Sequence, residues 1–134
     1  MKTTKNILTG ILAIIGFVAN INPVAAQSAA SGRTELQRHN LSIPGREVVQ
    51  VRVEINSGAG YPKHTHPGEE IIYILEGVLE YTVGDQPPVT LKPGNVLFIP
   101  AGTVHSVRNV GGTKGAELAT YILEKAKQQV TLVK

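Results

Sequence analysis

Three histidines and one glutamate occur in a spacing that suits a metal ion. His64 and His66 are separated by one residue, and side chains two positions apart in a β-strand point to the same face. Glu70 follows past a proline and a glycine that allow the chain to bend back, and His105 comes on a later segment. Three imidazoles and one carboxylate suit divalent Fe, Mn, Ni, Zn, Co or Cu.

Two other residues with metal-binding side chains, Glu69 and His39, are not expected to be ligands. Glu69 and Glu70 are adjacent, but the period of two places Glu70 on one face with Ile72 and Ile74 and turns Glu69 to the other. Glu70 is therefore the expected ligand. The fourth histidine, His39, lies in a polar stretch without a second ligand type nearby, so we expect it to take no part in the site.

The segments that must position these side chains read as short β-strands. Glu47 to Ile55 alternates strictly between apolar and polar residues, which is typical of a half-buried strand. Glycine- and proline-containing turns separate the runs that follow, a pattern that predicts an all-β sandwich or barrel. The further expected strands are 71–76, 78–83, 89–91, 95–99, 104–108, 117–123 and an edge strand at 130–133, with one helical turn over 124–129.

The N-terminal 26 residues have the composition of a secretory signal peptide. Two lysines precede an apolar stretch from Ile7 to Val18, and small residues close the segment at Ala26. The apolar stretch is shorter than the roughly 20 residues of a membrane-spanning helix. We expect cleavage after Ala26, a periplasmic or secreted protein with no membrane attachment, a flexible leader over 27–34 and one domain over 35–134.

Charge and cysteine content limit the function classes. Without the two lysines of residues 1–26, the chain holds 11 basic and 10 acidic side chains and no dense basic run, which argues against nucleic-acid binding. There is no cysteine, so disulfides do not stabilise the domain. Its core is modest, and a metal ion or a dimer interface would add stability.

The chain also resembles the cupin superfamily through two spaced motifs. The first, G-x5-HxH-x3-E-x6-G, and the second, G-x5-PxG-x2-H-x3-N, match at every fixed position. The matching residues are Gly58, His64, His66, Glu70 and Gly77, then Gly94, Pro100, Gly102, His105 and Asn109.

The resemblance implies a single-domain cupin jelly-roll β-barrel of six to eight strands, with the metal inside one end on His64, His66, Glu70 and His105. It also implies structural roles for the motif glycines, the motif proline and Asn109. Small chains of this kind resemble quercetin-dioxygenase-like (type 2) cupins and commonly form homodimers.

Two classes of function follow for such a site. The first is a metal-dependent enzyme acting on a small oxygenated substrate, either dioxygenase-like or an isomerase of a sugar acid, with Glu70 as a candidate base. The second is a protein that binds a small ligand or a metal without turnover, or that uses the metal structurally. Tyr61, Phe98 and Tyr121 are candidates to line the pocket, with a role in the core as the alternative.

Overall fold

The computed structural model describes residues 32–134, and this part of the chain is built from β-strands without a helix. The expected signal peptide and residues 27–31 of the expected leader lie outside the described residues. The strands are β1 (Gly32–Asn40), β2 (Arg46–Ile55), β3 (Gly60–Thr65), β4 (Gly68–Glu76), β5 (Leu79–Val83), β6 (Val89–Leu91), β7 (Val96–Ile99), β8 (His105–Asn109), β9 (Gly115–Glu124) and β10 (Thr131–Leu132).

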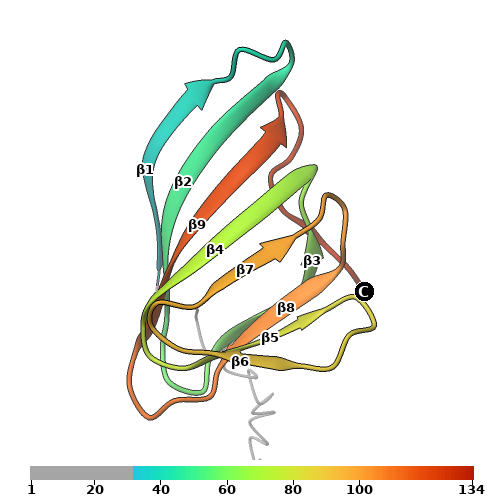
Figure 1. Ribbon diagram of the computed structural model, residues 1–134. Helices are drawn as coiled ribbons and strands as arrows, with labels where there is room; N and C mark the ends of the chain where they lie inside the picture. Colours follow the sequence, from blue (N-terminus) through green and yellow to red (C-terminus); the bar gives the residue numbers. More distant parts are fainter. Residues whose placement is uncertain (1–31) are drawn as a thin grey trace, which may run out of the picture.

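The strands form two antiparallel sheets that face each other (Figure 1). One sheet has the order β1-β2-β9-β4-β7 and the other the order β10-β3-β8-β5-β6. Within the first sheet, β2 and β9 are far apart in sequence but pair along their whole length in a regular antiparallel ladder. The expected all-β jelly-roll architecture is confirmed, with ten strands where the resemblance implied six to eight.

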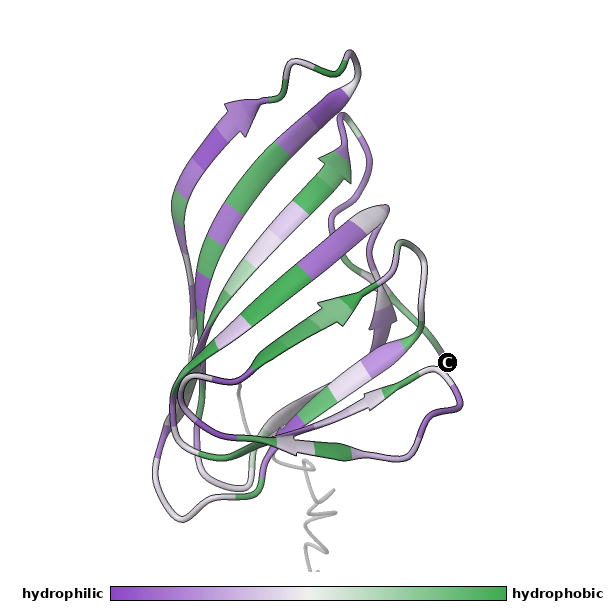
Figure 2. Cartoon of the chain, viewed as in Figure 1, coloured by the Kyte–Doolittle hydropathy of each residue, from purple (hydrophilic) through white to green (hydrophobic). Residues whose placement is uncertain are grey.

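The core lies between the two inner faces and follows the alternation seen in the sequence. Along β2 the side chains of Val49, Val51, Val53 and Ile55 are all buried. Figure 2 shows this alternation as hydrophobic and hydrophilic bands along the strands. β9 alternates in the same way. Its inward-facing residues include a glutamate, Glu117, whereas the buried residues of β2 are all aliphatic.

Two sequence predictions about the chain ends need correction, and a third is confirmed with shorter bounds. β1 was not expected, and because it begins at Gly32, residues 32–34 belong to the sheet rather than to a flexible leader. The helical turn expected over 124–129 is wrong: β9 continues to Glu124 and a turn follows, with Ala126 at a positive φ of 63°. The expected edge strand at 130–133 is present as the shorter β10, which pairs with β3.

Glycines serve two purposes in this frame. Gly77 and Gly94 have φ values of 77° and 90° and turn the chain between strands, as the motif suggested. Gly68 instead permits close packing, because a Cβ at this position would lie 1.9 Å from the carbonyl oxygen of Ile122 on β9. Among residues 32–134 there is no helix long and apolar enough to cross a membrane.

Candidate metal centre

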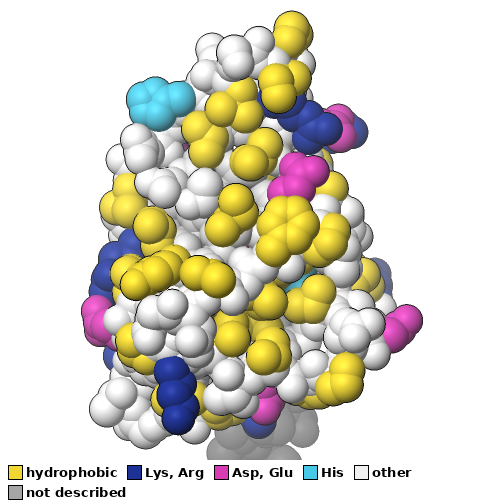
Figure 3. Space-filling view, in the orientation of Figure 1, with side chains coloured by type: hydrophobic (Ala, Val, Ile, Leu, Met, Phe, Trp, Pro, Cys, Tyr) yellow, Lys and Arg dark blue, Asp and Glu magenta, His cyan; other side chains and the backbone are white. Residues whose placement is uncertain are grey.

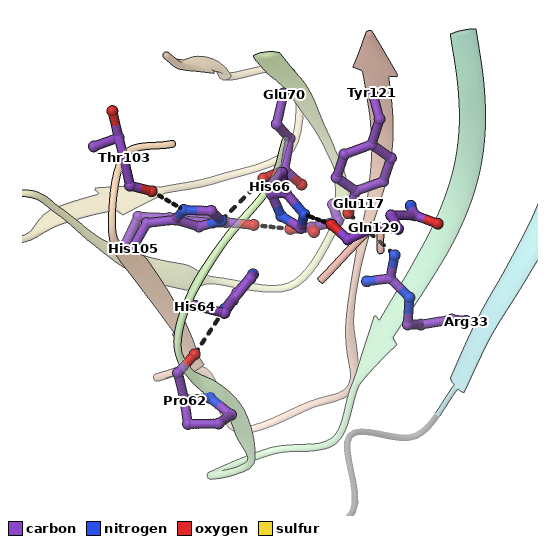
Figure 4. Close-up of polar contacts among 11 residues, drawn as sticks. Arg33, Pro62, His64, His66, Glu70, Thr103, His105, Glu117, Tyr121 and Gln129 are labelled. Atoms are coloured by element: carbon purple, nitrogen blue, oxygen red, sulfur yellow. Dashed lines mark hydrogen bonds and ion pairs between the residues drawn. The ribbon is translucent and has the colours of Figure 1, made fainter. Parts of the chain in front are cut away.

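The structure brings His64, His66, Glu70 and His105 together inside the barrel (Figure 4). His64 and His105 lie directly opposite each other on β3 and β8 of one sheet, and Glu70 comes from β4 of the other. His66 lies just beyond the end of β3, so it is not itself in the strand. The site therefore depends on the two sheets being held face to face.

The ring geometry of the cluster is compact. The candidate ligand atoms of the three histidines all lie within 4.8 Å of one another. Oε2 of Glu70 lies 3.1 Å from Nε2 of His105 and 3.3 Å from Nε2 of His66. All four side chains are buried, so these atoms have little contact with bulk solvent.

Each histidine is oriented by a backbone carbonyl. The Nδ1 atoms of His64, His66 and His105 lie 2.7, 2.6 and 2.9 Å from the carbonyl oxygens of Pro62, Gln129 and Thr103. A carbonyl oxygen only accepts hydrogen bonds, so each Nδ1 carries the proton and donates it. In the neutral ring the lone pair then lies on Nε2, the atom that points into the cluster.

This arrangement leaves a requirement for a cation. Nε2 of His66, Nε2 of His105 and Oε2 of Glu70 are buried and have no hydrogen-bond partner among residues 32–134. Lone pairs on two nitrogens and a carboxylate at about 3 Å repel one another unless a proton or a metal ion lies between them. A metal ion satisfies all these atoms together, so the residues present fit the implied cofactor.

The protonation states agree with this interpretation. Burial lowers the pKa of His64 to about 4, so its ring is neutral, the form that binds metals. Burial by itself raises the pKa of Glu70, but hydrogen bonds and charge from His105 and His66 outweigh it and lower the pKa to about 2. These contacts stabilise the carboxylate only when a proton, or a metal ion in its place, lies between Oε2 and the Nε2 atoms. Glu70 is therefore an ionised carboxylate at neutral pH.

The remaining candidates separate clearly. Glu69 points away from the cluster on the outer face of β4, and His39 is exposed and contacts only Gln37 by a side-chain hydrogen bond. Tyr121 is buried with its ring 4.8 Å from the ring of His66. Phe98 was a wrong candidate for the pocket: it lies on the outer face of β7 with 57% of its surface exposed.

Tyr61, the third aromatic candidate, is half-buried on β3 and packs against the hydrophobic core. Asn109 has the structural role that the motif suggested. Its side-chain amide donates to the carbonyl oxygens of Ile55 and Thr113, and its oxygen accepts from the backbone N–H of Gly111.

Sequence reasoning missed three residues near the centre. Glu117 is buried beside Tyr81, whose hydroxyl donates a hydrogen bond to it. Arg33 on β1 donates to the hydroxyl of Tyr121 across 3.3 Å. Gln129 provides the carbonyl for His66. Only Glu117 had a signal in the sequence, because the period of two through Tyr121 and Leu123 places it on the inner face.

Burial raises the pKa of Glu117 to about 8, and the charge of Glu70 contributes to the rise. Glu117 is therefore mostly protonated at neutral pH, and the interior holds one charged and one neutral carboxyl group. A pocket of about 390 Å³ has His105, but none of the other three candidate ligands, among its lining residues. It is lined by Lys63, Thr82, Gly84, Asp85, Val104, His105 and Ser106.

Comparisons with known proteins agree with this geometry. The family described as Cupin domain matches residues 51–121. The oxalate-binding protein of Thermotoga maritima is 31% identical over 112 residues, which cover 78% of this chain and 90% of that protein.

A second relative is similar over a shorter stretch. The dimethylsulfoniopropionate lyase DddQ of Ruegeria pomeroyi is 43% identical over 56 residues, which are 42% of this chain and 28% of that enzyme. The crystal structure of DddQ superimposes with a TM-score of 0.58 at 30% identity, covering 64% of this chain and 43% of the other. Several of the similar proteins are longer, and the matched part spans about half of their length or less.

Proposed function

The chain belongs to the cupin family, and we propose that it is a metal-dependent enzyme that acts on a small oxygenated substrate. His64, His66, Glu70 and His105 would hold a divalent transition metal, with Fe, Mn, Ni, Zn, Co and Cu as the candidates. Four protein ligands leave room for substrate on a five- or six-coordinate ion, and an open position distinguishes catalytic from structural sites. The bound metal would act as a Lewis acid or, if redox-active, support reaction with O₂.

The observation that carries this proposal is the set of buried, unpartnered atoms on His66, His105 and Glu70. The three backbone carbonyls keep the rings in one tautomer and one orientation, so the site is organised before a metal arrives. Glu70 is the candidate base. Glu70 is ionised at neutral pH, but contacts with His105 and His66 lower its pKa to about 2, so it would act as a base only where bound metal and substrate replace those contacts.

Two relatives bear on the substrate. One is named as a lyase of dimethylsulfoniopropionate and another as an oxalate-binding protein, and both names denote small carboxylates. The dioxygenase-like and the isomerase reactions remain the two proposed activities. The alternative function is binding of such a molecule, or of the metal, without turnover, and the name of the second relative favours it.

Metal analysis is the direct test. The protein is purified from its native compartment without chelators or affinity metals, and its content of the six candidate metals is measured by mass spectrometry. Close to one equivalent of a single metal is expected in the wild type, and much less in His105→Ala. Oxygen uptake and loss of substrate are then followed with small carboxylates. Metal binding without any turnover would favour the binding alternative, and absence of metal would contradict both.

Export and dimer formation are also part of the proposal. The signal-like residues 1–26 support a periplasmic or secreted protein. On the outer face of β4 and β7, Ile71 lies opposite Phe98 and Tyr73 opposite Val96, and all four side chains are exposed. Hydrophobic side chains are also prominent on the surface in Figure 3. Such a face at the edge of a sheet supports a homodimer, which sedimentation of wild type and Phe98→Glu would test.

A further inference from the structure

Arg33 directs its guanidinium group toward the interior next to the metal centre. On β1 it lies opposite Val53, whose side chain is buried, and directly opposite residues in a sheet share a face. Its Nη2 lies 3.3 Å from the hydroxyl of Tyr121, and its Cζ lies 5.6 and 6.0 Å from the ring centroids of Tyr121 and Tyr61. Both rings lie within cation–π distance of the guanidinium group, and Figure 4 shows this group directed toward Tyr121.

This cation is not neutralised by a contacting acid in the described part of the chain. Arg38, Arg52 and Arg108 each form ion pairs with surface glutamates, but within residues 32–134 Arg33 forms none. A guanidinium group has five N–H donors, and the Tyr121 hydroxyl accepts from one of its nitrogens. Arg33 is exposed, so a molecule from solvent is able to reach it.

The distances from Tyr121 set an upper limit to the separation of Arg33 from the histidine cluster. Tyr121 lies between them: its ring is 5.6 Å from Cζ of Arg33 and 4.8 Å from the ring of His66. Glu70 and Glu117 both act electrostatically on Arg33, but Glu117 is mostly neutral because burial raises its pKa to about 8. The two distances together place Cζ of Arg33 within about 10 Å of the ring centre of His66, and Arg33 has no ion-pair partner within residues 32–134.

We propose that Arg33 determines specificity by binding the carboxylate of a short oxygen-bearing acid whose other end reaches the metal at the three histidines. The planar fork of the guanidinium group matches a carboxylate in a two-point contact, and the rings of Tyr61 and Tyr121 lie within 6.0 Å of its Cζ. This inference rests on the proposed function, since it requires a metal at the histidine cluster. It assigns the substrate class: small carboxylic acids with a hydroxyl or carbonyl oxygen a few bonds from the carboxylate.

Calorimetric titration of the zinc-loaded full chain tests the assignment without relying on turnover. The probes are glycolate, 3-hydroxypropionate and 4-hydroxybutyrate, with 1,4-butanediol as the analogue that lacks a carboxylate. Wild type, Arg33→Gln, Arg33→Lys and Arg108→Gln are compared. Arg108→Gln removes the same charge from the outer face of the other sheet and is the matched control. Metal content and the circular dichroism spectrum are measured for each preparation.

At least one acid should bind the wild type more tightly than the diol. Arg33→Gln should weaken that acid about 10- to 100-fold, the usual range for hydrogen bonds to a charged group, and leave the diol unchanged. Arg33→Lys should lose part of the affinity, and Arg108→Gln should stay within about twofold of wild type.

Equal binding of the acid by wild type and Arg33→Gln, at equal metal content, would overturn the role of Arg33 while the proposed metal function stands. The same holds if the wild type binds no acid better than the diol. If the wild type retains no metal, the proposed function fails first and the inference fails with it. If Arg33→Gln does not fold, Arg33→Lys decides, because unchanged selectivity for acid over diol in that variant contradicts the two-point contact.

Discussion

Oε2 of Glu70 lies 3.1 Å from Nε2 of His105, although each of these atoms carries lone pairs toward the other. Replacing Glu70 by glutamine removes the negative charge and the basicity but keeps an oxygen donor. If Glu70 accepts a proton in the reaction, Glu70→Gln should keep appreciable metal and lose about 10²- to 10⁴-fold in turnover per bound metal. Metal content and rate are measured on the same samples. If Glu70 is only a ligand, activity falls in step with metal content, and the turnover per bound metal stays close to that of wild type.

Glu69→Gln is the control for this experiment, because Glu69 is the adjacent residue and points to the outer face. It should leave both metal content and turnover close to wild type. Loss of metal in Glu69→Gln with retention in Glu70→Gln would contradict the assignment of the site.

Removal of the metal should lower the melting temperature. A ligand that binds only the folded state stabilises it by about 4 kcal/mol at a thousandfold excess over its dissociation constant. Calorimetric scans with saturating metal and with a chelator are expected to differ by many degrees. His64→Ala should abolish most of the difference. Identical melting of the two wild-type samples would rule out a native metal site.

The stabilisation by metal should also decrease as pH falls. Burial holds the folded-state pKa of His64 at about 4, below the ordinary 6.5 of the unfolded chain, so folding disfavours its proton. The stability contributed by neutral His64 is complete above about pH 6.5 and is lost as pH falls toward 4. Protons and metal compete for the same three rings, so the difference between loaded and chelated protein should shrink over this range. Melting scans from pH 7.5 to 4.5 measure it.

Glu117 should make the free energy of unfolding decrease as pH rises, which is the opposite of the effect of His64. Its folded-state pKa of about 8 lies above the ordinary 4.5 because of burial and the charge of Glu70, so the folded protein retains a proton that the unfolded chain releases. This contribution is complete below about pH 4.5 and is lost as pH rises through 8. In metal-free protein, the melting temperature of Glu117→Gln should therefore rise relative to that of wild type as pH increases from 6 to 9. Each kcal/mol of stability corresponds to a shift of roughly 4–8 °C. A constant difference across this range would show that Glu117 does not titrate there.

Gly68 should not tolerate a side chain. A Cβ would lie 1.9 Å from the carbonyl oxygen of Ile122, and the contact is with backbone, so the sheet itself would have to shift. Gly68→Ala should destabilise the protein by about 1–3 kcal/mol or more. In Gly112→Ala, the matched control, the new Cβ meets nothing within 4 Å, and the change should stay within about 0.5 kcal/mol. Chemical denaturation of both variants provides the comparison.

The expected export remains a prediction with a simple measurement. Cleavage after Ala26 would leave Gln27 as the first residue of the mature protein. The intact mass of protein recovered from the periplasm or the medium should correspond to residues 27–134. A mass that still includes residues 1–26 would indicate a membrane-attached form instead.

Spacing along the chain was sufficient to choose the candidate ligands. His64, His66, Glu70 and His105 could be selected because strand periodicity and fixed turns convert sequence separation directly into side-chain direction. The same argument separated Glu70 from Glu69 and predicted the buried face of β2. These are local properties, and they depend little on which strands pair.

Only the tertiary structure shows the contacts between segments that are distant in sequence. Arg33 reaches Tyr121 only because β1 adds to the edge of the sheet, and the carbonyl of Gln129 reaches His66 only because the segment after β9 crosses to the other sheet. Phe98 was assigned to the wrong face for the same reason, since the direction of a short strand depends on the register of its pairing. Sequence alone determined the kinds of atoms in the site, and the pairing of the two sheets decided what surrounds them, because register and strand order are set by burial summed over the whole barrel.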